Sequence, residues 1–305
     1  MTRRGWLLFL GMSLFWGIPY FFIKIAVAEI DPSVVAFVRV AIAALILVPI
    51  AFSRRRFQTL KGRWGILVLL CAVQIVIPFL AISYGEQHIA SSLTSLLIAS
   101  EPIVVALLAL RLDKGERVSG LRLVGLGVGL IGVVVLLGLD VSGDEQRLLG
   151  AALILLAVIC YAIGALLIRR PAIASAPSLD VIAGECLLAL TVLTPLALLH
   201  WPTRVPSLGV LASLLVLGLI STALAWLVFF ALIAEVGASR GIVFTYVNPA
   251  VSVLLGVTLL GEPLGLGTIA GFLLILAGSW FSTGGRLLLP TKRLPERGRS
   301  SPKVS

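Results

Sequence analysis

The chain contains very little charge for its length. Asp, Glu, Lys and Arg make up only 12% of its 305 residues, whereas about a quarter is usual in soluble domains. Hydrophobic residues make up 59%, and the mean hydropathy is +1.13. These values exclude an ordinary water-soluble globular domain.

Residues that build catalytic and metal centres are also scarce. The chain has three cysteines, Cys71, Cys160 and Cys186, and two histidines, His88 and His200. The cysteines lie inside apolar runs and show neither metal-ligand spacing nor a disulfide pattern. We therefore expect them to be small packing residues. No Ser/His/Asp or metal-ligand constellation is present, so the sequence predicts no enzyme, no cofactor and no metal site.

Nucleotide-binding motifs are lacking as well. The chain has no P-loop, which argues against ATP-driven pumping by this chain alone. Gly127–Gly132 matches G-x-G-x-x-G, but a dinucleotide site requires a preceding strand, and this stretch lies within an apolar run. Gly125 and Gly129 instead form a G-x-x-x-G face, which is typical of closely packed membrane helices.

Hydrophobic residues fall into ten runs that are long enough to cross a bilayer core. Lipid offers no hydrogen-bond partners to the backbone, so each run is expected to be a helix. The sequence therefore predicts an all-α polytopic membrane protein with ten transmembrane helices, over residues 6–27, 33–52, 64–84, 90–110, 121–139, 148–168, 180–199, 207–230, 240–260 and 265–288.

The basic residues predict the orientation of these helices. With both termini in the cytoplasm, all of the 24 Lys and Arg residues except Lys24, Arg39, Arg147 and Arg204 fall in cytoplasmic segments. This asymmetry follows the positive-inside rule, so the net charge of +10 indicates topology rather than nucleic-acid binding. We expect a multi-pass protein of the plasma or inner membrane, with a disordered basic cytoplasmic tail over 290–305.

The two halves of the chain echo each other. Glu116, Gly125 and Gly132 recur 146 residues later as Glu262, Gly271 and Gly278. Each half contains five runs, and because five is odd, the second half enters the membrane from the opposite side. The sequence therefore predicts two inverted five-helix repeats, over 1–139 and 147–289.

The chain resembles the EamA-like branch of the drug/metabolite transporter superfamily over residues 6–288. The matching features are Phe15-Trp16-Gly17 with Lys24, Val38-Arg39-Val40-Ala41, Glu101-Pro102, Asn248-Pro249 and Leu260-Gly261-Glu262. In the first repeat, Asp113–Glu116 departs from the Leu-Gly-Glu pattern by one extra residue. The resemblance implies movement of small metabolites, amino acids or drug-like compounds, commonly outward.

Two prolines mark the candidate site. Pro102 and Pro249 lie near the middle of the fourth and ninth runs, where each removes a backbone hydrogen bond. Helix breaks at corresponding depths favour a midplane cavity between the repeats, although kinks that only improve packing are the alternative. Glu101 at this depth is expected to bind a substrate amine or carry a proton, or else to pair with Arg39 or Lys24.

Polar and aromatic side chains at similar depth complete the candidate cavity. Arg39 lies near the end of its run, where snorkelling to water is an equal alternative, and snorkelling is the favoured interpretation for Lys24. Glu185 is expected to be neutralised by Arg169 or Arg170. For any single ring, ordinary packing remains the alternative to substrate contact. The substrate-binding candidates are Trp16, Tyr20, Arg39, Gln74, Glu101, Tyr161, Trp226, Thr245 and Asn248.

The sequence thus predicts a secondary active transporter, an exporter of small metabolites, that works by alternating access. Protons are the expected coupling ion through Glu101, and fifth-helix glycines offer a homodimer contact as an alternative to pairing between the halves. The rival classes are an integral membrane enzyme, which would need a catalytic constellation, and a non-transporting membrane scaffold, which needs no polar breaks at mid-depth.

Overall fold

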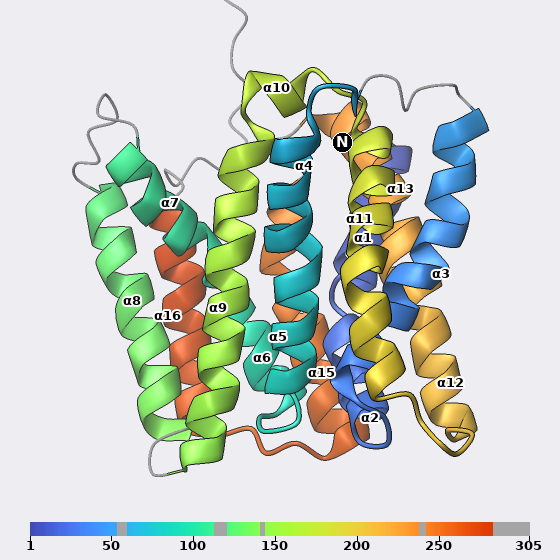
Figure 1. The fold of residues 1–305 in the computed structure, drawn as a ribbon. Coiled ribbons are helices and arrows are strands. Elements are labelled where there is room, and N and C mark those ends of the chain that lie inside the picture. Colours follow the sequence, from blue (N-terminus) through green and yellow to red (C-terminus); the bar gives the residue numbers. More distant parts are fainter. Residues whose placement is uncertain (54–59, 113–120, 141–143, 238–241, 283–305) are drawn as a thin grey trace, which may run out of the picture.

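The computed structural model describes residues 1–53, 60–112, 121–140, 144–237 and 242–282, and within these ranges it is helical without strands (Figure 1). The predicted tail over 290–305 and the loop Asp113–Glu116 lie outside the described residues. Eight helical stretches are long and apolar enough to span a membrane, and Leu123–Gly138 and Leu266–Phe281 are shorter apolar helices. Together these ten stretches correspond to the ten predicted runs and confirm the all-α polytopic fold.

The described helices follow the chain in two series of five runs. The first series comprises α1 (Arg3–Phe15), α2 (Pro19–Val27), α3 (Pro32–Ser53), α4 (Trp64–Cys71), the π-helical η2 (Ala72–Val76), α5 (Ile77–Gly85), α6 (Ser91–Ile98), α7 (Glu101–Leu112) and α8 (Leu121–Asp140). The second comprises α9 (Glu145–Ile168), the short α10 (Pro171–Ala174), α11 (Ser178–Leu199), α12 (Leu208–Leu215), the π-helical η3 (Val216–Leu224), α13 (Ala225–Val236), the 3₁₀ turn η4 (Ile242–Tyr246), α15 (Asn248–Leu260) and α16 (Leu266–Ser282).

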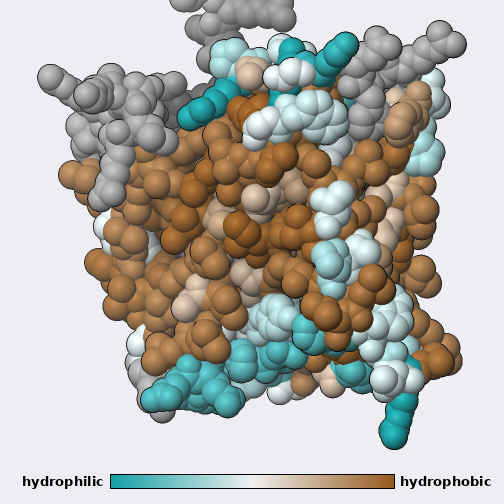
Figure 2. All heavy atoms as spheres, viewed as in Figure 1, coloured by the Kyte–Doolittle hydropathy of each residue, from teal (hydrophilic) through white to brown (hydrophobic). Residues whose placement is uncertain are grey.

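The helices stand side by side in one bundle with two polar ends. The N-terminal face carries the start of α1 together with α10, and the distal face carries the connections from α2 to α3 and from α5 to α6 (Figure 1). A hydrophobic band separates hydrophilic rims at the two ends (Figure 2). This distribution is what a bilayer core between two aqueous surfaces requires.

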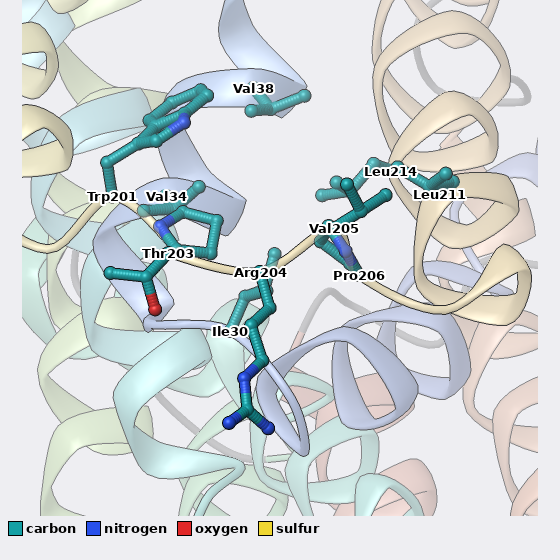
Figure 3. Close-up of a pocket in the computed structure, with 11 residues that line it drawn as sticks. Ile30, Val34, Val38, Trp201, Thr203, Arg204, Val205, Pro206, Leu211 and Leu214 are labelled. Atoms are coloured by element: carbon teal, nitrogen blue, oxygen red, sulfur yellow. The ribbon is translucent and has the colours of Figure 1, made fainter.

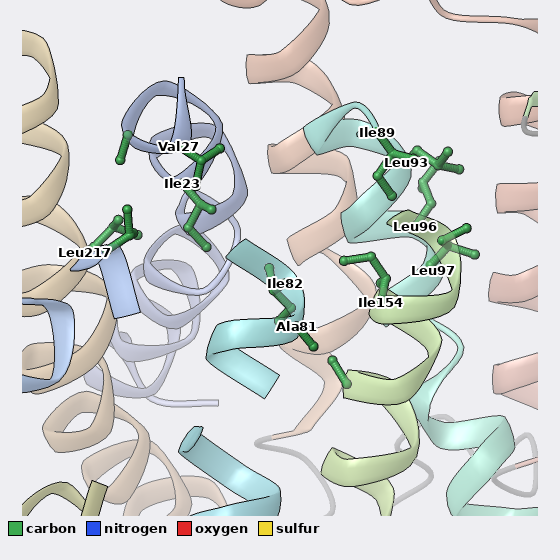
Figure 4. Close-up of a cluster of buried hydrophobic side chains, with 14 of the residues drawn as sticks. Ile23, Val27, Ala81, Ile82, Ile89, Leu93, Leu96, Leu97, Ile154 and Leu217 are labelled. Carbon is green, nitrogen blue, oxygen red and sulfur yellow. The ribbon is translucent and has the colours of Figure 1, made fainter. Parts of the chain in front are cut away.

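The buried apolar clusters each contain residues from both halves of the chain, and one of them illustrates this. Ile23 of α2, Ile82 of α5, Leu96 of α6, Ile154 of α9 and Leu217 of η3 are all at most 2% exposed and belong to it (Figure 4). Since α9 and η3 follow the join between the repeats, the core is shared between halves rather than divided into two separate cores.

Glycines bring α8 and α16 into very close contact. A Cβ on Gly132 would lie 2.8 Å from Ile275 N, and one on Gly278 would collide with the backbone of Gly129. Small residues let membrane helices approach until their backbones touch. The G-x-x-x-G face of the first half therefore packs against the second half of the same chain, which is one of the two pairings that the sequence left open.

Candidate functional site

The fourth run is interrupted at the position of Pro102. Helix α6 ends at Ile98, and α7 begins at Glu101 with Pro102 as its second residue. The Ser279 hydroxyl of α16 donates to Ala99 O over 3.3 Å, so a carbonyl at the interruption obtains a partner from the other half. Such re-satisfaction allows a helix break within a membrane.

The ninth run is interrupted in the same way. The 3₁₀ turn η4 ends at Tyr246, and α15 begins with Asn248 and Pro249. The Asn248 side chain is placed with its amide nitrogen toward two backbone carbonyls. In this orientation the nitrogen donates to Phe244 O (2.9 Å) and to Ser13 O (3.1 Å), which lies in the last turn of α1. Asn248 therefore ties the second interruption to the first helix.

The first run contains a third interruption, which the sequence analysis did not predict. Helix α1 ends at Phe15, and α2 begins at Pro19. A Cβ on Gly17, within the interruption, would lie 2.7 Å from both Ser13 O and Val251 of α15. Pro19 was the available signal, because a proline is favoured at the first turn of a helix and not in its interior.

Two π-helical segments occupy corresponding positions in the third run of each half. η2 carries Gln74, and a Cβ on Gly164 of α9 would lie 2.6 Å from Gln74 Cγ, so the glutamine packs on the backbone of α9. In η3 the Thr222 hydroxyl donates to Leu217 O over 2.8 Å. π-Helical turns are rare and often mark functional sites.

Arg39 is buried beside the second of these segments. It is 8% exposed, its Nε donates to Thr222 Oγ1 over 2.8 Å, and its guanidinium lies 4.0 Å from the centre of the Phe79 ring. These contacts hold the cation inside the protein and do not support the snorkelling alternative. Within the described part of the chain, no carboxylate forms an ion pair with it.

Two tyrosines lie within the electrostatic reach of both Arg39 and Glu101. Tyr20 of α2 and Tyr161 of α9 are partly buried, and each interacts electrostatically with both Arg39 and Glu101. Glu101 is itself partly buried, and no described residue forms an ion pair or hydrogen bond with its carboxylate. The predicted alternative of a structural ion pair between Glu101 and Arg39 or Lys24 is therefore absent from the described structure.

The remaining candidates lie around the interruptions on the side of α1 and α13. Trp16 stacks edge to face on Trp226 with ring centres 5.3 Å apart, and its ring also contacts Phe229 and Phe244. Trp226 packs in turn against the apolar cluster that contains Phe79. Thr245 lies in η4 next to this group. Trp226 thus connects the aromatic candidates to the cluster whose Phe79 ring lies under Arg39.

Lys24 binds the backbone at the end of α5. Its ammonium group donates to Glu86 O (2.5 Å) and to Ile89 O (2.8 Å), beyond the end of α5. A cation at a helix C-terminus satisfies carbonyls that have no partner in the helix. Lys24 thus binds backbone carbonyls at the distal end of the bundle and remains partly exposed there.

Glu262 forms a cap between the halves on the distal face. Its Oε1 accepts from Ser91 N (2.7 Å) and its Oε2 from Ser92 N (2.9 Å), the first N–H groups of α6. Gly261 at φ +66° turns the chain after α15, and Gly256 leaves space that a Cβ would take from the carboxylate. The repeat glutamate thus caps a helix of the other repeat.

Removing this cap should destabilise the protein. We expect Glu262→Ala to lower the free energy of unfolding by about 1–3 kcal/mol, because two buried backbone N–H groups lose a charged acceptor. Thermal unfolding in one detergent measures the change. Glu145→Ala, at an exposed position in the first turn of α9, is the control and should lie within about 0.5 kcal/mol of the unmodified protein. Equal effects of the two changes would contradict the capping role.

A cavity of about 450 Å³ lies at the distal face, among α3, α12 and the connection from α11 to α12. Ile30, Val34, Trp201 and Leu214 line it, and Arg204 extends along its rim (Figure 3). Ser207 N and Oγ donate to the Glu29 carboxylate over 2.9 and 2.5 Å, and these bonds hold the pKa of Glu29 below its ordinary value. This apolar cavity is lined by a different set of side chains from the Arg39 cluster.

Glu185 differs from its predicted role. It is 1% exposed in α11, and neither of its carboxylate oxygens has a hydrogen-bond partner in the described structure, so the expected contact with Arg169 or Arg170 does not form.

In the described ranges, no group of three or more His, Cys, Asp and Glu side chains is arranged to hold a metal ion. Cys71, Cys160 and Cys186 are buried and free.

Comparison with known proteins identifies the class of this bundle. A model of the EamA-like transporter family matches twice, over residues 3–138 and 148–284. The chain is 27% identical to "Uncharacterized transporter YvbV" of Bacillus subtilis, over 90% of each chain, and 29% identical to "Uncharacterized inner membrane transporter YedA" of Escherichia coli K12, over 92% of this chain and 91% of the relative. It is 28% identical to an "Uncharacterized transporter" of Archaeoglobus fulgidus, over 90% and 97%.

A solved structure shares the fold. It superimposes with a TM-score of 0.65 at 18% sequence identity, over 93% of this chain and 97% of the solved one, and is titled "Crystal structure of protein". The fold, the apolar band and the two family matches converge on one assignment. This multi-pass membrane protein belongs to the EamA-like transporter family.

Proposed function

We propose that the chain is a secondary active transporter that exports small zwitterionic metabolites, such as amino acids, through the Arg39–Glu101 region. The observation that carries the proposal is a buried cation and a partly buried carboxylate that form no ion pair in the described structure and that interact electrostatically with the same two tyrosines. A zwitterion has a carboxylate for Arg39 and an ammonium group for Glu101. Such charge-assisted contacts are stronger in a buried site than in bulk water.

The surrounding rings define the rest of the proposed binding region. Trp16 and Trp226 offer large apolar faces, of which Trp226 packs on the cluster that contains Phe79, and the Tyr20 and Tyr161 hydroxyls offer hydrogen bonds. An apolar lining with a few convergent polar groups is the usual construction of a small-molecule site. We propose the three interruptions, near Trp16, Pro102 and Pro249, as the boundary of this region.

The two faces of the bundle each carry a contact that alternating access would break in turn. On the N-terminal face, the Thr2 hydroxyl donates to Glu235 Oε1 of α13 over 2.7 Å. On the distal face, Glu262 caps α6. Rocking of one repeat against the other would release one contact while keeping the other. Arg3, Arg4, Arg169 and Arg170 support a cytoplasmic N-terminal face.

Flux through the isolated protein tests this function. The full chain is reconstituted into liposomes loaded with labelled amino acids, and efflux is measured with and without a proton gradient. We expect efflux above that of protein-free liposomes, accelerated by the gradient, with the solute chemically unchanged. A scaffold would give no efflux, and an enzyme would give an altered solute; either result from folded protein would overturn the proposal.

A further inference from the structure

Glu86 is a buried acid on the distal side that the proposed substrate-binding role of Arg39 and Glu101 does not include. It follows α5 and begins the segment Glu86–Ser92, which connects α5 with the first turn of α6. The residue is 0% exposed, and neither of its carboxylate oxygens has a hydrogen-bond partner in the described structure. A buried carboxylate without partners is costly when ionised, so its burial requires an explanation.

The backbone of this segment is held from two sides. Lys24 of α2 donates to the carbonyls of Glu86 and Ile89, and Glu262 of the second repeat accepts from the N–H groups of Ser91 and Ser92. The segment therefore lies where the two repeats meet on the distal face. Separation of the repeats there would expose Glu86 to water.

The charged and polar groups around Glu86 offset the burial of its charge only in part. Lys24 and Tyr20 face it from α2, Arg39 from α3 and Glu262 from the connection after α15, while the Thr94 hydroxyl faces it from α6. Lys24 donates its hydrogen bonds to the carbonyls of Glu86 and Ile89 rather than to the carboxylate, and Glu262 adds a second negative charge. Glu86 also stands at the negative end of the α5 dipole.

We propose that Glu86 is a proton-binding group that makes the distal closure of the transporter sensitive to pH. With the repeats closed, the carboxyl is neutral and buried. When they separate, the proton leaves to water on the distal side, and the electron pair remains on the solvated carboxylate. This inference rests on the alternating access proposed above and adds a site separate from Glu101.

The sign of the pH effect follows from the environment of Glu86. Burial raises the pKa of Glu86 well above its ordinary range, Glu262 raises it further, and Lys24 opposes both. The closed state therefore binds this proton more tightly than the open state, where the carboxyl is hydrated. Acid favours closure and alkali favours opening, by up to about tenfold in the equilibrium per pH unit between the two pKa values.

Chemical labelling of a cysteine at the distal contact between the repeats measures how often this contact opens. Ser92 is 3% exposed, and its contact with Glu262 uses the backbone N–H, so Ser92→Cys keeps that contact. The variant is made in a full-length background in which Cys71, Cys160 and Cys186 are replaced by alanine, and is reconstituted into liposomes. Labelling by a membrane-impermeant maleimide is timed between about pH 5 and pH 9, across the range where a raised carboxyl pKa lies.

The labelling rate also rises with pH because the thiol itself ionises. Dividing the rate by that of the Glu86→Gln protein, which carries the same thiol, cancels this contribution. We expect the ratio of the labelling rate with Glu86 to that with Glu86→Gln to rise about tenfold across the range. Glu86→Asp should retain the rise, as should Glu29→Gln, which removes an exposed distal acid instead. A flat ratio, or no labelling of the Glu86 protein at any pH, would overturn the proposal.

The flux assay keeps the two proposals apart. A protein that labels with this pH dependence but moves no solute would refute the transport function and leave the proton site in place. A protein that transports while the labelling ratio stays flat would refute only the role of Glu86. Size-exclusion chromatography of each variant establishes that it is folded before labelling.

Discussion

Replacing Gly278 by alanine is expected to destabilise the protein by about 1–3 kcal/mol or more. A Cβ at this position would collide with the backbone of Gly129 and lie 2.7 Å from Gly125 O, so α8 and α16 would have to separate. Backbone atoms cannot move aside as a flexible side chain can. Because the two helices join the repeats, the strain would weaken the whole assembly rather than one surface.

Gly127 provides the matched control for this experiment. It lies in α8, close in sequence to Gly129, but a Cβ on it would meet nothing within 4 Å. Alanine has the higher helix propensity, so Gly127→Ala should leave the stability unchanged or raise it by up to about 1 kcal/mol. Thermal unfolding of both variants in the same detergent measures the difference. A similar loss of stability in Gly127→Ala and Gly278→Ala would show that the glycines do not act by letting α8 and α16 approach each other.

The sequence predicted the fold well because membrane helices leave a simple signal. Length and hydropathy were sufficient to place all ten runs, and the recurrence of Glu116 and Gly132 as Glu262 and Gly278 revealed the duplication. The sequence did not determine whether the glycines pair within or between chains, because a small-residue face is the same in both cases. The π-helical η2 and η3 were also not predicted, since length and hydropathy are the same for a π-helical and an α-helical segment of a membrane helix.

The sequence predicted some residues of the candidate site and missed others. Arg39, Glu101 and the two tyrosines stood out because polar groups are rare within apolar runs. Phe79 was missed because a phenylalanine carries no signal in such a run, although its ring lies under Arg39. Glu86 was missed because an acid at the end of a run resembles a solvated loop residue. Its complete burial depends on how Lys24 and Glu262 enclose the segment.

The largest functional effect is expected at Arg39. In Arg39→Gln, transport of an amino acid should lose the cation that binds its carboxylate, a charge-assisted interaction of about 1.5–3 kcal/mol. The concentration for half-maximal flux should therefore rise by about tenfold to hundredfold. Arg39→Lys keeps the charge but lacks the planar group that lies over Phe79 and the Nε that reaches Thr222, so we expect it to recover only part of the affinity.

Two further variants separate binding by Arg39 from its structural role. Thr222→Val removes the acceptor that positions Nε and should raise the half-maximal concentration less than Arg39→Gln, because the charge remains. Arg204→Gln, on the rim of the distal cavity, removes a cation elsewhere and should leave flux unchanged. If Arg39→Gln were folded and transported every tested amino acid with unchanged affinity, the buried guanidinium would be a structural cation, and the zwitterion proposal would have lost the charge on which it depends.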